Sequence, residues 1–234
     1  MMAATEWPVV ELHPDVSVAT LDDSPALDAD TAAHVAALWE RACATRPSLY
    51  NGRVFCATEI APDRIAGRWT EYRLALAQML DPDLFEVLQL RPLAVNGLMR
   101  TPDGIVLGRR AAKAIYQPDL RQSVPAGSIE SRNGDRPVDL AAQLAAEIEE
   151  ELGLSARDVV IHAPLLTCEH PGTHIVDIGI PFDCALPFAT IHDIWQRHGN
   201  DEYDALECIA HPLSLHDATD VVPTTRAMIG RLTP

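Results

Sequence analysis

A cluster of glutamates is the feature of this sequence that best suits chemistry. It lies in the segment EIEEELG, residues 147–153. If the segment is helical, with 3.6 residues per turn, Glu147 and Glu151 lie one turn apart on the same face. Glu150 lies beside them within an arc of roughly 100°, whereas Glu149 points away. Three carboxylates are therefore predicted to gather at one end of a helix.

The predicted helix covers about residues 137–152 and carries one apolar stripe, which should pack against a sheet. Pro137 suits a position in its first turn, and Gly153 suits the position just past its end. The stripe consists of Leu140, Ala141, Leu144, Ala145, Ile148 and Leu152. Because the clustered glutamates lie along one edge of this stripe, the helix would hold them close to the sheet.

Such a cluster is unfavourable at the C-terminal end of a helix. Like charges at this spacing cost roughly 0.2–0.5 kcal/mol per pair, and the negative end of the helix dipole disfavours them further. A cation such as Mg²⁺ would remove the conflict, since it takes oxygen ligands and completes its shell with water and substrate phosphates. It would also lower the pKa of a bound water that attacks phosphorus. The alternative is a solvated, glutamate-rich helix end stopped by a glycine.

The charge of the whole chain restricts its partners. Its 234 residues include 34 Asp and Glu but only 18 Lys and Arg, which gives a net charge of −16. Binding to the backbone of DNA or RNA needs a basic face, so no nucleic-acid partner is expected. The densest basic cluster consists of Arg109, Arg110 and Lys113. It suits the oxygens of a diphosphate, or it is an ordinary surface cluster.

Residues 125–154, PAGSIESRNGDRPVDLAAQLAAEIEEELGL, resemble the box of the Nudix hydrolase family, G-x5-E-x7-R-E-U-x-E-E-x-G-U, in which U is aliphatic. The second half of the box matches residues 147–154. Residues 125–130 are similar to the loop that enters the family's helix, and LAVNGLMRTPDGIVLGRR is similar to its first core strands. The Nudix-like part covers about residues 90–232.

The sequence departs from the box in three places. The spacing from Gly127 to Glu147 is about five residues longer, as though SRNGDR had been inserted. Ala146 replaces the box arginine, which in the family helps to hold the catalytic carboxylates. The middle glutamate has no clean counterpart, because Val138 falls at its position and Asp139 only beside it. These departures leave open a catalytically silent module that binds a nucleotide.

The stretch ALWERACATRPSLYNGRVFCATEIAP is similar to the extension that precedes the Nudix domain in a subgroup of UDP-sugar hydrolases. Members of that subgroup also lack the box arginine and have a longer entry loop. The resemblance implies a small-molecule nucleotide substrate, a UDP-hexose, hydrolysed with Mg²⁺ to UMP and a sugar 1-phosphate. Mn²⁺ is the substitute cation. ADP-ribose, another nucleoside diphosphate-X and a dinucleotide are the alternative substrates.

The resemblance also assigns roles in metal binding and catalysis. Glu147, Glu150 and Glu151 would be the catalytic residues and the metal ligands, and the backbone carbonyl of Ala126 would complete the metal site. Gly127 would allow a close approach of the backbone, or is a plain turn glycine.

Further residues are candidates for the substrate site. Arg109 and Arg110 would bind the diphosphate, and Glu130 would orient a ligand or reach the substrate. The general base is not identified by the sequence: it is either a box glutamate or one of the later acids Glu169, Asp201, Glu202 and Asp204. For uridine the candidates are Tyr50, Asn51 and Phe55, of which the two aromatic residues equally suit a core.

Strand and helix patterns alternate irregularly along the chain, which predicts an α+β fold. Residues 1–88 are expected to form a small α+β N-terminal region, with helices over about 30–46 and 72–80. Residues 89–234 are expected to form a Nudix-like α/β/α sandwich, with a mixed sheet between helices. Its predicted strands lie in a hairpin over about 90–110 and near 159–167, 174–182 and 205–210. Its other predicted helices lie near 189–198 and 221–232.

The sequence also indicates a compartment. No apolar run reaches the roughly 18–20 residues that span a bilayer, and the N-terminus lacks the features of a signal peptide. The five cysteines are scattered and never spaced as CxxC, which disfavours a disulfide framework or a structural zinc site. A cytoplasmic protein without a membrane partner is expected, and the oligomeric state stays open.

Overall fold

The computed structural model describes residues 7–22, 26–132, 134, 137–215 and 217–231. At its centre the predicted hairpin forms from β5 (Leu93–Thr101) and β6 (Gly104–Arg110). β11 (Val176–Cys184) runs parallel to β5, with Val176 opposite Leu93. These strands place the sheet centre where the sequence predicts core strands.

In the described part of the chain, nine strands form the larger sheet, in the order β1-β10-β11-β5-β6-β12, with β7, β8 and β9 paired to β6, β5 and β11. The sheet is mixed, because β5 and β11 are parallel while the neighbouring pairs are antiparallel. The remaining strands are β1 (Val9–Glu11), β7 (Arg121–Ser123), β8 (Ala126–Ser128), β9 (Val159–Ile161), β10 (Leu166–Glu169) and β12 (Tyr203–Ile209).

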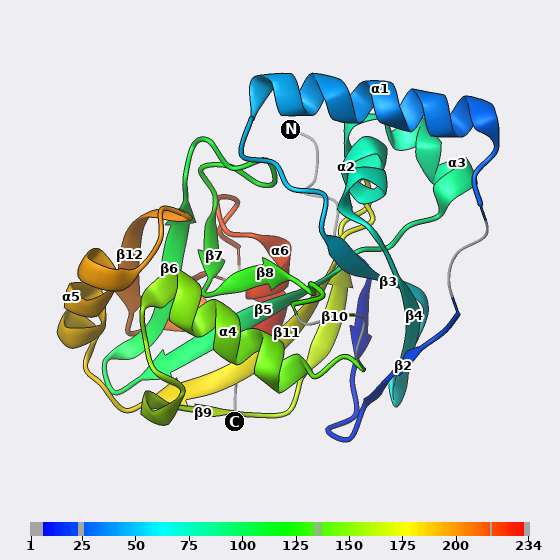
Figure 1. Ribbon diagram of the computed structural model, residues 1–234. Helices are drawn as coiled ribbons and strands as arrows, with labels where there is room; N and C mark the ends of the chain where they lie inside the picture. Colours follow the sequence, from blue (N-terminus) through cyan, green and yellow to red (C-terminus); the bar gives the residue numbers. More distant parts are fainter. Residues whose placement is uncertain (1–6, 23–25, 133, 135–136, 216, 232–234) are drawn as a thin grey trace.

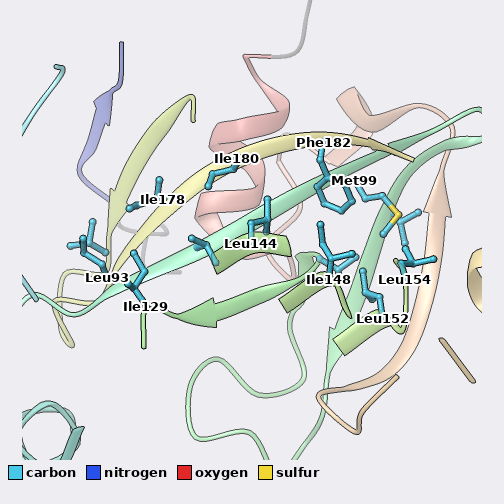
Figure 2. Packing of buried hydrophobic residues seen from close by; sticks show 14 of the residues in the cluster. Leu93, Met99, Ile129, Leu144, Ile148, Leu152, Leu154, Ile178, Ile180 and Phe182 are labelled. Carbon is cyan, nitrogen blue, oxygen red and sulfur yellow. The ribbon is translucent and has the colours of Figure 1, made fainter. Parts of the chain in front are cut away.

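Helices cover both faces of this sheet, with α4 (Leu140–Leu152) on one face and α6 (Pro223–Ile229) on the other (Figure 1). Alternate β11 residues, such as Ile178 and Phe182, pack with Leu144 and Ile148 of α4 (Figure 2). The intervening Gly179 lies against Met228 of α6. α5 (Phe188–His198) packs against α4. The predicted α+β fold, with a mixed sheet between helices, is confirmed.

The N-terminal region forms a smaller sheet, ordered β2-β4-β3, with helices at one end of the molecule (Figure 1). Its elements are β2 (Ser17–Thr20), α1 (Ala29–Thr45), β3 (Arg53–Ala61), β4 (Arg64–Glu71), α2 (Tyr72–Leu80) and α3 (Phe85–Leu88). The region is joined closely to the rest, because β1 pairs with β10. In addition, Phe55 and Trp69 belong to the same core cluster as α4.

The start of α4 differs from the prediction. Pro137 precedes the helix, and Asp139 is the N-cap, whose side chain accepts a hydrogen bond from the Ala142 amide. The carboxylate of an aspartate in this position accepts a hydrogen bond from a backbone N–H of the first turn, whereas a proline side chain has no acceptor atom. Ala141, predicted in the apolar stripe, is exposed. Gly153 ends the helix as predicted, with a left-handed φ of 68°.

Short elements also escaped prediction. The three-residue strands β7 and β8, the helix α3, and the 3-10 helices at Pro82–Leu84, Ala156–Asp158 and Pro212–Leu215 carry too few residues for a periodic pattern. None of the helices that the structure describes is long and apolar enough to cross a membrane.

Candidate active site

Two of the clustered glutamates are buried at the C-terminal end of α4. Glu147 is 6% exposed and Glu151 is 4% exposed. Glu149 and Glu150 are exposed, so the helix presents its four acids to two different environments. A solvated helix end would leave Glu147 and Glu151 in water, and this alternative is therefore wrong for both residues.

Several groups fix the carboxylate of Glu147. Its Oε1 accepts hydrogen bonds from Gln143 Nε2 at 2.7 Å and from Arg132 Nη2 at 2.7 Å. A Cβ atom on Gly127 would lie 2.4 Å from Glu147 Cδ and Oε2, so only a glycine leaves room for this carboxylate. Burial raises the pKa of Glu147, and Arg132 opposes that rise. The close approach predicted at Gly127 is thus an approach to Glu147.

Glu151 is held on its other side by β8 and β12. Its Oε2 accepts hydrogen bonds from the Tyr203 hydroxyl at 2.7 Å and from the Ala126 amide at 3.1 Å. Burial raises the pKa of Glu151 well above its ordinary range, against the hydrogen bond from Tyr203. Ala126 therefore lies at the cluster as predicted, and the contact that it makes there is through its N–H.

A chain of hydrogen bonds connects Arg110 to this site. The buried guanidinium of Arg110 donates to the Tyr116 carbonyl, to Gln122 Oε1 and to Glu202 Oε1. The Gln122 amide in turn donates to the hydroxyl of Tyr203, which donates to Glu151. Arg110 thus supports Glu151, with its guanidinium already engaged by three acceptors. Arg109 is exposed and is not among the residues that line the cleft described next.

A cleft of about 830 Å³ opens beside the carboxylates. Glu147, Glu150 and Glu151 lie on its wall, together with Ala126 and Gly127 of β8. Its remaining charged or hydroxyl-bearing lining residues are Arg46, Ser48, Tyr72, Arg110, Lys113, Tyr116, Ser128, Glu130, Arg132, Asp177, Asp201 and Glu202. The cleft therefore collects residues from both the N-terminal region and the larger sheet.

Glu130 lies on this wall as the sequence suggested. Partial burial raises its pKa, while Arg132 lowers it and Glu150 raises it further. Of the candidate bases, Asp201 and Glu202 line the cleft, where they pair with Lys113 and Arg110. Glu169 and Asp204 are not among the lining residues.

The candidates for uridine binding are not in the cleft. Tyr50 is 81% exposed, Phe55 is fully buried against Trp69, and the Asn51 side chain is bonded to Glu71. From the N-terminal region, the structure instead brings Arg46, Ser48, Tyr72 and Met79 to the cleft wall. No motif in the sequence distinguishes these cleft residues from their neighbours in the chain, so they were not predicted.

Three supporting residues were not identified from the sequence. Gln143 precedes Glu147 by one helical turn, a spacing that would have revealed it. Arg132 lies within the inserted SRNGDR, and Tyr203 lies within the acidic segment GNDEYDALE, where no local signal marks either residue. Asp177, buried at the cleft and bonded to the Thr224 hydroxyl, was also missed.

The carboxylate oxygens of the glutamates on α4 are chemically suited to bind a hard divalent cation, because such oxygens are its preferred ligands. Because Gly127 has no side chain, the carboxylate of Glu147 can also lie directly against the backbone of β8. Across the described ranges, however, no three His, Cys, Asp or Glu side chains converge as a complete metal site. The positive charge at the carboxylates is supplied by the guanidinium of Arg132, 2.7 Å from Glu147 and 3.5 Å from Glu150.

The sequence matches no family model and no curated protein. Several solved structures are similar to the chain. The MutT protein from Methanosarcina mazei is 17% identical, with a TM-score of 0.45, over 60% of this chain and 91% of that protein. DR0079 from Deinococcus radiodurans is 14% identical, with a TM-score of 0.49, over 78% and 99%. A Nudix-family hydrolase from Clostridium perfringens is 15% identical, with a TM-score of 0.41, over 60% and 94%.

Proposed function

We propose that this chain is a Nudix-type hydrolase that uses a divalent cation to cut the diphosphate of a nucleoside diphosphate-linked substrate. The observation that carries the proposal is the pair of buried carboxylates, Glu147 and Glu151, on the wall of a large cleft. Burying two acids one turn apart is costly unless a cation or a proton compensates them. The cleft volume of about 830 Å³ suits a small-molecule ligand.

The residues of α4 fit the proposed cation, Mg²⁺ with Mn²⁺ as substitute. Glu147, Glu150 and Glu151 would hold it, and the Ala126 carbonyl is the proposed fourth ligand. When bound, the cation would neutralise diphosphate charge and lower the pKa of an attacking water. Gln143 and Tyr203 keep the two buried carboxylates in place through the hydrogen bonds described above.

The cationic side chains of the cleft are the proposed contacts of the diphosphate. Within the described residues, the Arg46 guanidinium has no ion-pair partner, so it is available to a phosphate oxygen at the end of α1. Lys113 lies on the same cleft, and its ion-pair partner among the described residues is the exposed Asp201. For the general base we propose a box glutamate, Asp201 or Glu202, because both of these later acids line the cleft.

The proposed substrate is a UDP-sugar, cut to UMP and sugar 1-phosphate, and the proposed compartment is the cytoplasm. The N-terminal stretch that resembles UDP-sugar hydrolases supports this choice, because Arg46 and Ser48 of that stretch line the cleft. ADP-ribose and other nucleoside diphosphate-X compounds remain the competing substrates. A silent nucleotide-binding module is the second candidate function, favoured by Ala146 and by the engagement of Glu147 with Arg132.

Incubation with Mg²⁺ and a panel of UDP-glucose, ADP-ribose and a dinucleotide, followed by product chromatography, tests these choices. We expect UMP from UDP-glucose, and we expect the Glu151→Gln variant to lose turnover by about a thousandfold or more, because it loses a charged group at the reacting centre. AMP from ADP-ribose without UMP would reject the UDP-sugar assignment. Nucleotide binding without any product would favour the silent module.

A further inference from the structure

Arg132 lies where the carboxylates of α4 need positive charge. Its Nη2 is 2.7 Å from Glu147 Oε1, and both Nη atoms are 3.5 Å from Glu150 Oε2. Among the described side chains, no other Lys, Arg or His forms an ion pair with Glu147, Glu150 or Glu151. Within the part of the chain that the structure describes, the guanidinium of Arg132 therefore compensates the cluster from outside the helix.

The backbone delivers Arg132 to this position. Residues 129–131 pair with β3 of the smaller sheet, through the Phe55 amide to the Ile129 carbonyl at 2.9 Å and the Ser131 amide to the Arg53 carbonyl at 3.0 Å. Arg132 follows this paired segment directly. The position of its Cα atom is thus fixed by a sheet that lies outside the predicted Nudix-like part.

The side chain of Arg132 has room to leave. It is 39% exposed and lies on the wall of the 830 Å³ cleft. It also lines a second hollow of about 310 Å³, bounded by Trp69, Val138 and Asp139. The contact to Glu150 is long for an ion pair, so the close contact to Glu147 is the main one to be broken.

We propose that Arg132 is a resident counter-ion, which occupies the carboxylate cluster in the metal-free protein and must be displaced from Glu147 when a divalent cation binds. The inference rests on the proposed function, because it assumes that the cation binds at these glutamates. A divalent cation on the carboxylate of Glu147 would lie close to the guanidinium that contacts Oε1 of the same carboxylate, and the two positive charges repel each other. Arg132 therefore lowers the affinity for the metal while it stabilises the metal-free fold. Once displaced, its guanidinium stays on the cleft wall, within reach of an anionic ligand.

The proposal predicts two effects of opposite sign for the Arg132→Gln variant. The metal-free variant should unfold at a lower temperature than the wild type, because Glu147 loses its charged partner. The same variant should bind Mn²⁺ more tightly, since the metal no longer competes with a guanidinium. A merely structural arginine would give the first effect, but its removal would leave the metal affinity unchanged or weaker.

Electron paramagnetic resonance of free Mn²⁺, titrated with the full-length chain without nucleotide, measures the affinity directly. Thermal unfolding in EDTA measures the metal-free stability. We expect Arg132→Gln to bind Mn²⁺ about tenfold more tightly and Arg132→Lys to fall between it and the wild type. Arg197→Gln is the matched control, because it removes the same charge from an exposed pair with Asp193 on α5 and should change neither quantity.

The outcomes separate the inference from the proposed function. If the wild type binds Mn²⁺ and Arg132→Gln binds it no more tightly, the counter-ion role is overturned and the hydrolase proposal stands. If neither folded protein binds Mn²⁺, the metal-dependent function itself is overturned, and the counter-ion role with it. Should Arg132→Gln not fold, the comparison of Arg132→Lys with the wild type decides in the same way.

Discussion

The glycine at position 127 and the carboxylate of Glu147 share one small space in the site. A Cβ atom there would lie 2.4 Å from two atoms of the carboxyl group. Those atoms are the far end of a flexible side chain, so the fold can give way by moving the carboxylate alone. The cost of a larger residue at this position should therefore fall on function and much less on stability.

We expect Gly127→Ala to lose at least tenfold in kcat/KM for the hydrolysis reaction, while its free energy of unfolding changes by only about 1 kcal/mol. Kinetics with Mg²⁺ and urea unfolding of the same preparation measure the two quantities. Gly172→Ala is the control, because a Cβ atom at Gly172 meets nothing closer than 3.4 Å. A large loss of stability in Gly127→Ala, with normal kinetics in the folded fraction, would contradict this account.

At the scale of elements, the last turn of α4 and the helix α5 meet at Gly153. Its φ of 68° is a left-handed conformation that a side chain disfavours by about 1–2 kcal/mol. A Cβ atom there would also lie 2.5 Å from the Cβ atom of His198, so α5 would have to shift. This glycine both ends the helix and allows its neighbour to pack closely.

We expect Gly153→Ala to lower the free energy of unfolding by about 2–3 kcal/mol, the sum of backbone strain and a displaced helix contact. Urea unfolding should show a lower midpoint with an unchanged slope. Gly230→Ala is the control, since Gly230 also caps a helix but has a φ of −60°, and a Cβ atom there would meet nothing closer than 3.6 Å among the described residues. Equal effects of the two substitutions would reject the argument.

The sequence predicted those elements whose pattern is local. The apolar period of α4, its glycine stop and the TPDG hairpin each carry their own signal, and all three formed. By contrast, β1 joins the larger sheet through β10, more than 150 residues away, and no local pattern encodes such a partner. Arg132 is a similar case, because the pairing of residues 129–131 with β3 places it beside Glu147, and β3 lies far away in the sequence. The cluster of glutamates was thus predictable, but the groups that hold it were not.

At the scale of the whole molecule, Asp177 lies where β11, α6 and the cleft meet. It is 5% exposed and accepts a hydrogen bond of 2.6 Å from the Thr224 hydroxyl of α6. Burial raises its pKa from 3.8 to about 6, against the hydrogen bond from Thr224 and the charge of Arg110. Folding therefore favours the protonated acid, and ionisation of Asp177 above this pKa opposes folding.

The contribution of Asp177 to stability is full below pH 3.8 and is lost as the pH rises to about 6. The loss amounts to about 3 kcal/mol, at 1.36 kcal/mol for each tenfold change in proton affinity. We expect Asp177→Asn, which cannot ionise, to gain about 2–3 kcal/mol over the wild type between pH 4 and pH 7, as measured by urea unfolding at a series of pH values.

The exposed Asp220, whose pKa Arg121 lowers through hydrogen bonds, provides a control of opposite sign. Because its ionised form is the one that folding favours, Asp220→Asn should lose a small amount of stability at pH 7, and the loss should disappear as the pH falls. Glu147 and Glu151 also have a raised pKa, so the wild-type curve alone mixes several groups. The difference between Asp177→Asn and the wild type isolates one of them, and a difference that does not vary with pH would mean that Asp177 is already ionised at pH 4.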